Sequence, residues 1–187
     1  HKPKHTMPDL NLTAPVHTAE KDQLIDDLAG AIMTAALKAV KERDVFHLAL
    51  SGGSTPEVLY TRIVTCPIYR GLPWAKTHIW IVDERRVPET DDKSNAKMIR
   101  ETLVSHVDIN TRRFHTVPVA EEDNAATIYD QEVRDVVGDG QQRTRRADEP
   151  PRIDVVLLGM GDDCHTASLF PESPALKEGK RLVVGND

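Results

Sequence analysis

The chain has 187 residues, of which 39% are apolar and 29% charged, and its formal net charge at pH 7 is −6. This length suits one domain with a substantial buried core. The acidic balance argues against a general nucleic-acid-binding protein, although a local group of arginines would suffice to bind a small anionic ligand.

The sequence holds two cysteines, Cys66 and Cys164, and no CxxC pair. We therefore expect neither a disulfide framework nor a zinc cluster, and the cysteine usage favours a reducing compartment. No apolar run approaches the length of a membrane span, and no secretory leader is visible. We expect a cytoplasmic protein without a membrane partner, with a peroxisome-like organelle as the open alternative.

The first elements in chain order are an N-terminal tail over 1–17 and a helix over 18–43, with Thr18 as its N-cap. Apolar residues recur along this helix at helical spacing: Leu24, Leu28, Ile32, Ala35, Ala36, Ala39 and Val40. A short, continuous apolar run over 45–50 predicts a strand buried on both faces, followed by a helix from Pro56.

Strands and helices continue to alternate along the rest of the chain. The predicted elements are a strand at 77–82, a helix at 94–107 capped by Ser94, a weak strand at 112–119, a helix at 121–137, a solvated loop at 138–151, the clearest strand at 152–159, and a strand-like run at 182–184. This order is typical of a single α/β domain over 18–187 with a mainly parallel sheet.

Three loops that follow predicted strands carry the functional signal: 51–56, 83–87 and 159–168. Ligands of such sheets bind outside the carboxyl ends of the strands, so we expect these loops to share one edge.

The loop "SGGSTP" joins a strand to a helix, and its glycines let the backbone approach a ligand. Free N–H groups at the helix start and the hydroxyls of Ser51, Ser54 and Thr55 suit a phosphate, with Gly52 and Gly53 between them. The loop matches neither a Walker A loop nor GxGxxG. A tight turn capped by a hydroxyl group is the equally weighted alternative.

The loop "DERRV" places two acids and two bases directly after a strand. Its arginines could clamp a phosphate or a carboxylate in bidentate fashion. Taken alone, the loop is better interpreted as a solvated group of ion pairs.

The loop "GMGDDCHTAS" is the richest, because Gly159 and Gly161 permit an irregular turn and Asp163 lies two residues before His165. A histidine oriented by a carboxylate is the common design for activating water or a hydroxyl group. A structural histidine in a turn is the less favoured interpretation.

The other histidines compare poorly: His47 and His78 lie inside strands, where hydrogen-bonded core residues are expected, and His115 has no local group of functional residues. Cys164 is a poor nucleophile for His165, because adjacent side chains rarely point at one reaction centre. The spacing of Asp162, Asp163 and His165 does not require a metal site.

Four segments together resemble a known family. "LALSGGSTP", "WIVDERRVP", "DDKSNAKMI" and "VVLLGMGDDCHTASLFP" resemble 6-phosphogluconolactonases, in that order and at comparable spacing, from about the first helix onward. The last segment is the specific one. Glucosamine-6-phosphate deaminases share the fold and the first two loops.

The resemblance implies a Rossmann-like, three-layer α/β fold with a mainly parallel sheet. It implies hydrolysis of 6-phosphoglucono-δ-lactone in the oxidative pentose phosphate pathway, with no metal and no organic cofactor. We expect the partner to be this small phosphosugar lactone rather than nucleic acid or a membrane, and the chain to be a monomer.

By position, the resemblance implies that His165 is the catalytic base with Asp163 as its neighbour. The substrate-binding residues expected from the loops and the resemblance are Ser51, Gly52, Gly53, Ser54, Thr55, Asp83, Arg85 and Gly161.

The sequence departs from the family at two places. Cys164 stands where relatives usually have glycine, and the strand-like run near the end breaks off at Asp187 where relatives continue. We therefore expect the domain to lack its C-terminal portion. Two other functions stay open: a phosphosugar deaminase or isomerase with Asp83 as its base, and a phosphosugar-binding module without turnover.

Overall fold

The computed structural model describes residues 15–119, 123–141 and 151–186. The helices and strands in chain order are α1 (Lys21–Arg43), β1 (Phe46–Leu50), α2 (Ser54–Thr65), β2 (Thr77–Ile81), α3 (Asn95–Thr102), β3 (Phe114–His115), α4 (Ala125–Gln141) and β4 (Val155–Val156). Short 3₁₀ turns lie between them at 67–71, 74–76, 104–106, 111–113 and 174–177. Most of the predicted tail lies outside the described residues.

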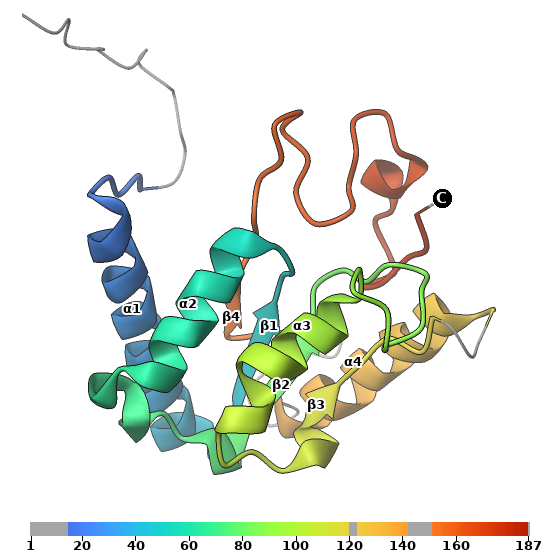
Figure 1. Ribbon diagram of the computed structural model, residues 1–187. Helices are drawn as coiled ribbons and strands as arrows, with labels where there is room; N and C mark the ends of the chain where they lie inside the picture. The colour runs from blue at the N-terminus through green and yellow to red at the C-terminus, as the bar shows by residue number, and fades with distance from the viewer. Residues whose placement is uncertain (1–14, 120–122, 142–150, 187) are drawn as a thin grey trace, which may run out of the picture.

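The strands form one parallel sheet in the order β3-β2-β1-β4 (Figure 1). Apolar residues of α1, α2 and α3 cover one face, and α4 packs on the other through Tyr129, Val133 and Val137. The prediction of a three-layer α/β fold is therefore confirmed. In the described part of the chain, no helix combines the length and the apolar character that crossing a membrane needs.

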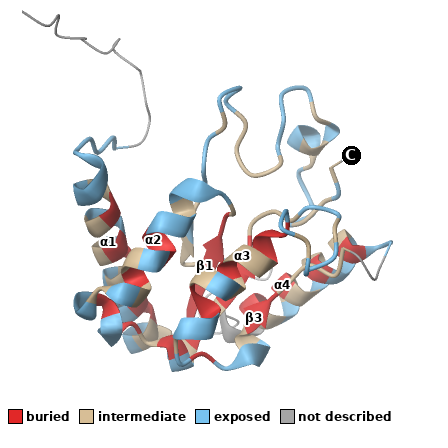
Figure 2. Cartoon of the chain, viewed as in Figure 1, coloured by how far each residue is buried: buried red, intermediate tan, exposed pale blue. Residues whose placement is uncertain are grey.

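The central strand β1 is buried along its whole length, as its continuous apolar run predicts (Figure 2). Ser94 caps α3 by accepting a hydrogen bond from the amide of Lys97, also as predicted. Thr18 is not a cap: α1 begins at Lys21, with Glu20 at the N-cap position and no side-chain cap bond.

The buried stripe of α1 differs from the prediction by part of a turn. It consists of Ile25, Ala29, Ile32, Ala36 and Ala39, at alternating spacings of four and three residues. Leu28 belongs to the neighbouring stripe and is 40% exposed. Small alanines on the buried stripe allow the helix to lie close to the sheet.

The strand predicted over 152–159 is much shorter, since only Val155 and Val156 are paired. Asp154 anchors its start, where its carboxylate contacts the guanidinium of Arg43 and accepts from the amide of His47. Among the described residues β4 pairs only with β1, so the ladder ends where the chain leaves that neighbour.

Two further predictions are wrong at element ends. The run at 182–184 is not a strand, because the amides of Leu182 and Val183 donate to the carboxylate of Asp130 on α4 instead of to a neighbouring strand. The predicted solvated loop begins later than 138, since α4 continues to Gln141; residues 142–150 lie outside the described part.

A cluster of histidines lies on the face of the sheet that α4 covers. His78 Nδ1 lies 2.8 Å from His115 Nε2, and His115 Nδ1 lies 2.5 Å from a carboxylate oxygen of Glu132. The indole N–H of Trp80 donates to His47 Nδ1 over 3.1 Å. His115 thus does have partners, which the register of neighbouring strands brings together and which its local sequence does not reveal.

Burial sets the charge state of His47 and His78. Loss of solvation lowers the pKa of His47 to about 3 and that of His78 to about 4, and neighbouring cations act in the same direction. His47 is only partly satisfied, because its Nε2 is buried without a hydrogen-bond partner among the described residues. Both histidines are therefore neutral at neutral pH, His47 in the core and His78 at a half-buried position.

Candidate active site

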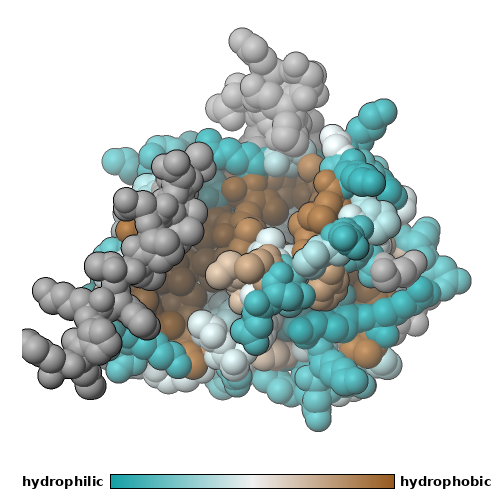
Figure 3. All heavy atoms as spheres, turned by 90° about the horizontal axis from the view of Figure 1, so that it is seen from above, coloured by the Kyte–Doolittle hydropathy of each residue, from teal (hydrophilic) through white to brown (hydrophobic). Residues whose placement is uncertain are grey.

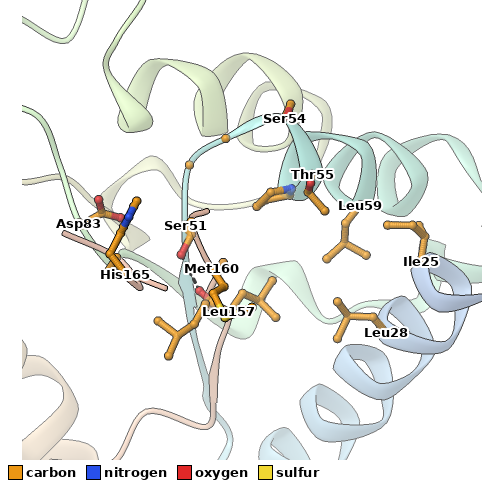
Figure 4. A pocket seen from close by; sticks show the side chains of 17 residues that line it. Ile25, Leu28, Ser51, Ser54, Thr55, Leu59, Asp83, Leu157, Met160 and His165 are labelled. Carbon is orange, nitrogen blue, oxygen red and sulfur yellow. Dashed lines mark hydrogen bonds between the residues drawn. The ribbon is translucent and has the colours of Figure 1, made fainter. Parts of the chain in front are cut away.

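A pocket of about 480 Å³ opens at the carboxyl ends of β1, β2 and β4. Figure 3 shows apolar atoms gathered in the hollow at this end of the molecule, and Figure 4 shows the lining side chains. The lining residues are Ile25, Leu28, Ser51, Gly52, Gly53, Ser54, Thr55, Pro56, Leu59, Asp83, Leu157, Leu158, Gly159, Met160, Gly161, His165 and Ala167. The three loops do share one edge, as predicted.

The loop after β1 is a structural joint as well as a pocket wall. The hydroxyl of Ser51 donates to the carbonyl of Leu157 over 2.7 Å, and the hydroxyl of Tyr60 donates to the carbonyl of Ser51 over the same distance. Ser51 is 4% exposed. Its hydroxyl therefore fastens the loop to the segment after β4.

The start of α2 faces the pocket with its amides uncapped by side chains. Gly53 holds the N-cap position at a φ of 107°, a conformation that favours glycine, and no described side chain caps this helix. Ser54 and Thr55 are exposed in the first turn and line the pocket. Such a helix start attracts an anion through its N–H groups and its dipole.

The residues of "DERRV" separate into different roles. Asp83 lines the pocket, where its carboxylate accepts from the hydroxyl of Ser168 over 2.7 Å. Glu84 instead accepts from the amides of Asn95 and Ala96, both at 2.8 Å, and so stabilises the start of α3.

Arg85 does not line the pocket. Its guanidinium donates to the carbonyl of Lys93 over 2.9 Å and to Oδ1 of Asn95 over 2.5 Å. Asn95 in turn lies directly against Gly52 of the β1–α2 loop. The structure therefore links Arg85 to the predicted phosphate loop through Asn95.

The loop after β4 carries the histidine predicted to act as a base. His165 Nδ1 contacts a carboxylate oxygen of Asp163, and the hydrogen bond from His165 lowers the pKa of Asp163. A carboxylate on Nδ1 selects the Nδ1–H tautomer of a neutral imidazole and leaves Nε2 as the proton acceptor. The pair is thus arranged as a base with an orienting partner.

Gly161 makes room for that histidine. A Cβ atom at position 161 would lie 2.2 Å from Cε1 of His165, and the amide of Gly161 donates to the carbonyl of His165 over 2.8 Å. The ring of Phe170 lies on another side, with the two ring centroids 4.7 Å apart. Glycine is therefore required at 161 by close approach.

Cys164 occupies a left-handed conformation with a φ of 65°. Its side chain is exposed and does not line the pocket, so it does not narrow the site. The described residues contain no group of three or more His, Cys, Asp or Glu side chains placed to hold a metal ion.

Sequence reasoning missed the apolar half of the pocket and one polar tie. The helical spacing predicts Leu28 in the core, yet Leu28 lines the pocket. The end of the strand predicted at 152–159 supplies Leu157 and Leu158, and Met160 follows it. Ser168 stands in the motif "HTAS", but its bond to Asp83, 85 residues away, has no local signal.

The sequence is similar to a known protein family and to individual proteins of that family. The model of a family described as glucosamine-6-phosphate isomerases/6-phosphogluconolactonase matches residues 19–187. The human GDH/6PGL endoplasmic bifunctional protein is 42% identical over 178 residues, which cover 91% of this chain and 21% of that protein. A 6-phosphogluconolactonase of Nostoc sp. is 41% identical over 83% of this chain and 62% of its own length.

Solved structures agree with these relatives. The 6-phosphogluconolactonase from Trypanosoma cruzi superposes with a TM-score of 0.73 at 26% identity, over 88% of this chain and 65% of that one. The chain thus spans less than two thirds of these relatives.

Proposed function

Because the chain belongs to the family of glucosamine-6-phosphate isomerases and 6-phosphogluconolactonases, we propose that it hydrolyses 6-phosphoglucono-δ-lactone to 6-phosphogluconate in the oxidative pentose phosphate pathway. The observation that carries this proposal is that His165, whose Nδ1 contacts Asp163, lines the same pocket as the uncapped start of α2. One end of the pocket supplies a base, and another attracts an anion. The relatives named as 6-phosphogluconolactonases favour the lactone over an amino-sugar substrate.

The loop from Ser51 to Thr55 holds the substrate phosphate in this proposal. The amides of the first turn of α2 and the exposed hydroxyls of Ser54 and Thr55 donate to the phosphate oxygens. Gly52 and Gly53 let the ligand approach the backbone. Anchoring the phosphate fixes the position of the lactone ring relative to His165.

His165 then activates water. Its Nε2 removes a proton from a water molecule as the oxygen attacks the lactone carbonyl carbon, while Asp163 stabilises the imidazolium that forms. N–H groups of the glycine-bearing loops stabilise the tetrahedral oxyanion. The imidazolium returns the proton to the ring oxygen as the C–O bond breaks.

No step in this sequence requires a metal ion or an organic cofactor. We further propose that the protein acts as a cytoplasmic monomer on this small substrate, without nucleic-acid or membrane partners, as the sequence leads us to expect.

An assay with two substrates tests the proposal. Freshly prepared 6-phosphoglucono-δ-lactone should release acid faster with the protein than without it, and glucosamine-6-phosphate should release no ammonia. Ammonia release would instead support a deaminase with Asp83 as its base. Binding of 6-phosphogluconate without turnover of either substrate would support a phosphosugar-binding module.

A further inference from the structure

Asn95 joins three parts of the site without lining the pocket. It is the first residue of α3, and it is 2% exposed. A buried amide side chain needs hydrogen-bond partners for both its oxygen and its nitrogen. Here the carboxamide oxygen and nitrogen both form hydrogen bonds with the loop after β2. The carboxamide also lies against the loop after β1.

The contacts of this carboxamide are specific. Its Nδ2 donates to the carbonyl of Asp83 over 2.7 Å, and its Oδ1 accepts from the guanidinium of Arg85 over 2.5 Å. A Cβ atom at Gly52 would lie 1.7 Å from that same Oδ1. The amide therefore fills the space that a side chain at position 52 would need.

The backbone of Asn95 is fixed by other groups. Its amide donates to Glu84, and the hydroxyl of Ser94 caps the helix through the amide of Lys97. Truncating the Asn95 side chain thus leaves the start of α3 intact. This separation makes a role in positioning testable apart from a role in folding.

We propose that Asn95 is a positioning residue that fixes the Gly52 backbone of the phosphate loop against Asp83 and Arg85. The proposal rests on the proposed function for its substrate and deepens it. It also assigns Arg85 an indirect role, since the guanidinium acts on the loop through Asn95 rather than by lining the pocket.

Kinetics of Asn95→Ala provide the first test. Because misplacing a binding group by about 1 Å can cost up to about 100-fold, we expect KM for the phosphorylated lactone to rise about tenfold or more. We expect kcat to change less than threefold, because the Asp163–His165 pair is untouched. Asn95→Asp keeps the acceptor for Arg85 but loses the donor to the Asp83 carbonyl and adds a negative charge beside the phosphate loop, so its KM should rise at least as much.

Asn110→Ala is the matched control. Asn110 lies at the start of a 3₁₀ turn, where its side chain accepts from the amide of Arg112, and it does not line the pocket. Its KM should equal that of the parent. An Asn95→Ala protein with an unchanged KM, or with a loss confined to kcat, would overturn the proposal.

A steric rescue tests the contact without any activity. Gly52→Ala should lower Tm by about 4 °C or more, since overpacking a filled space is destabilising. The double variant Gly52→Ala/Asn95→Ala should melt within about 2 °C of Asn95→Ala, because the added methyl group then has room. Equal destabilisation by Gly52→Ala in both backgrounds would overturn the packing on which the proposal stands.

The kinetic experiment and the melting experiment distinguish a failure of this proposal from a failure of the proposed function. If the parent protein hydrolyses no lactone, the function fails, while the melting temperatures and calorimetric titration with 6-phosphogluconate still decide the role of Asn95. If the parent is active and Asn95→Ala behaves as the parent in both arms, only the role of Asn95 fails.

Discussion

The two sides of the pocket differ sharply in packing. β1 is buried along its whole length, whereas none of the described residues from 151 to 186 is fully buried (Figure 2). The phosphate loop follows β1, whereas His165 lies in the 151–186 segment. One side of the site therefore belongs to the buried core, whereas the other is held on that core by partly buried apolar residues and by hydrogen bonds.

Two of these hydrogen bonds lie at the pocket. Ser51 bonds to Leu157, and Ser168 bonds to Asp83, so each joins the 151–186 segment to the end of a buried strand. Within the segment, Asp163 holds the ring of His165. We call the sheet with its packed helices the buried half of the site, the 151–186 segment the exposed half, and the hydrogen bonds just named the ties. We infer that substitutions in the buried half change mainly the stability of the fold, and that substitutions of the ties change mainly kcat.

The largest expected effect is that of His165→Ala. Loss of a general base typically costs about 10²–10⁴-fold in rate, so kcat should fall by that range while Tm stays within about 2 °C of the parent. His106→Ala is the control, because His106 is exposed, its ring bonds to the carbonyl of Glu101, and it does not line the pocket. A kcat within a few-fold of the parent would remove His165 from the proposed mechanism.

Acid should unfold the well-packed half through its histidines. The folded pKa of His47, about 3, lies below the unfolded value of about 6.5. The unfolded chain thus binds more protons as the pH falls below about 6.5, and stability is lost from there down to about pH 3. His47 alone should contribute roughly 2 kcal/mol of this loss between pH 6.5 and 4.5.

Urea unfolding across this pH range measures the effect. His47→Phe should lower the slope of the unfolding free energy against pH. At the steepest part the decrease should reach about 1.4 kcal/mol per pH unit, which corresponds to the uptake of one proton. Equal slopes in the parent and in His47→Phe would mean that His47 takes up no proton on unfolding.

A medium effect is expected from Ser168→Ala, which removes a tie between the two halves. Freeing the 159–168 loop from Asp83 should lower kcat about tenfold, by loosening the position of His165. The core is untouched, so Tm should change by less than about 2 °C. Ser105→Ala, away from the pocket, controls for loss of a hydroxyl. A large drop in Tm with unchanged kcat would reverse the division of roles between the halves.

Sequence patterns predict the buried half well, because its signals are local. The continuous apolar run at 46–50, the cap at Ser94 and the order of elements all follow from neighbouring residues. The order of strands in a parallel sheet also places the Asp163–His165 pair and the β1–α2 loop at one edge. Their catalytic and binding roles stay predictions.

The exposed half is predicted less well for a physical reason. The apolar run at 152–159 reads as a long strand, yet strand length depends on a neighbour to pair with, and β4 has one such neighbour among the described residues. The tie from Ser168 to Asp83 and the packing of Asn95 on Gly52 join distant segments. Tertiary contacts of this kind leave no local pattern.

The smallest effect is expected at Cys164, in the exposed half and next to the base. Its φ of 65° costs an L-residue about 1 kcal/mol, and a change to glycine removes that strain while adding freedom to the unfolded chain. The two terms nearly cancel, so Cys164→Gly should change Tm by less than about 3 °C. Because the thiol does not line the pocket, kcat should stay within twofold.

Cys164→Ala separates the effect of the thiol from that of the backbone strain, since it removes the thiol and keeps a side chain at the strained position. If both variants fold but lose activity, the thiol takes part in the chemistry and the water-activating role of His165 has to be revised. If only the glycine variant loses activity, a Cβ atom at this position is needed to hold the 161–165 turn, and the ties of the exposed half include backbone stiffness as well as hydrogen bonds.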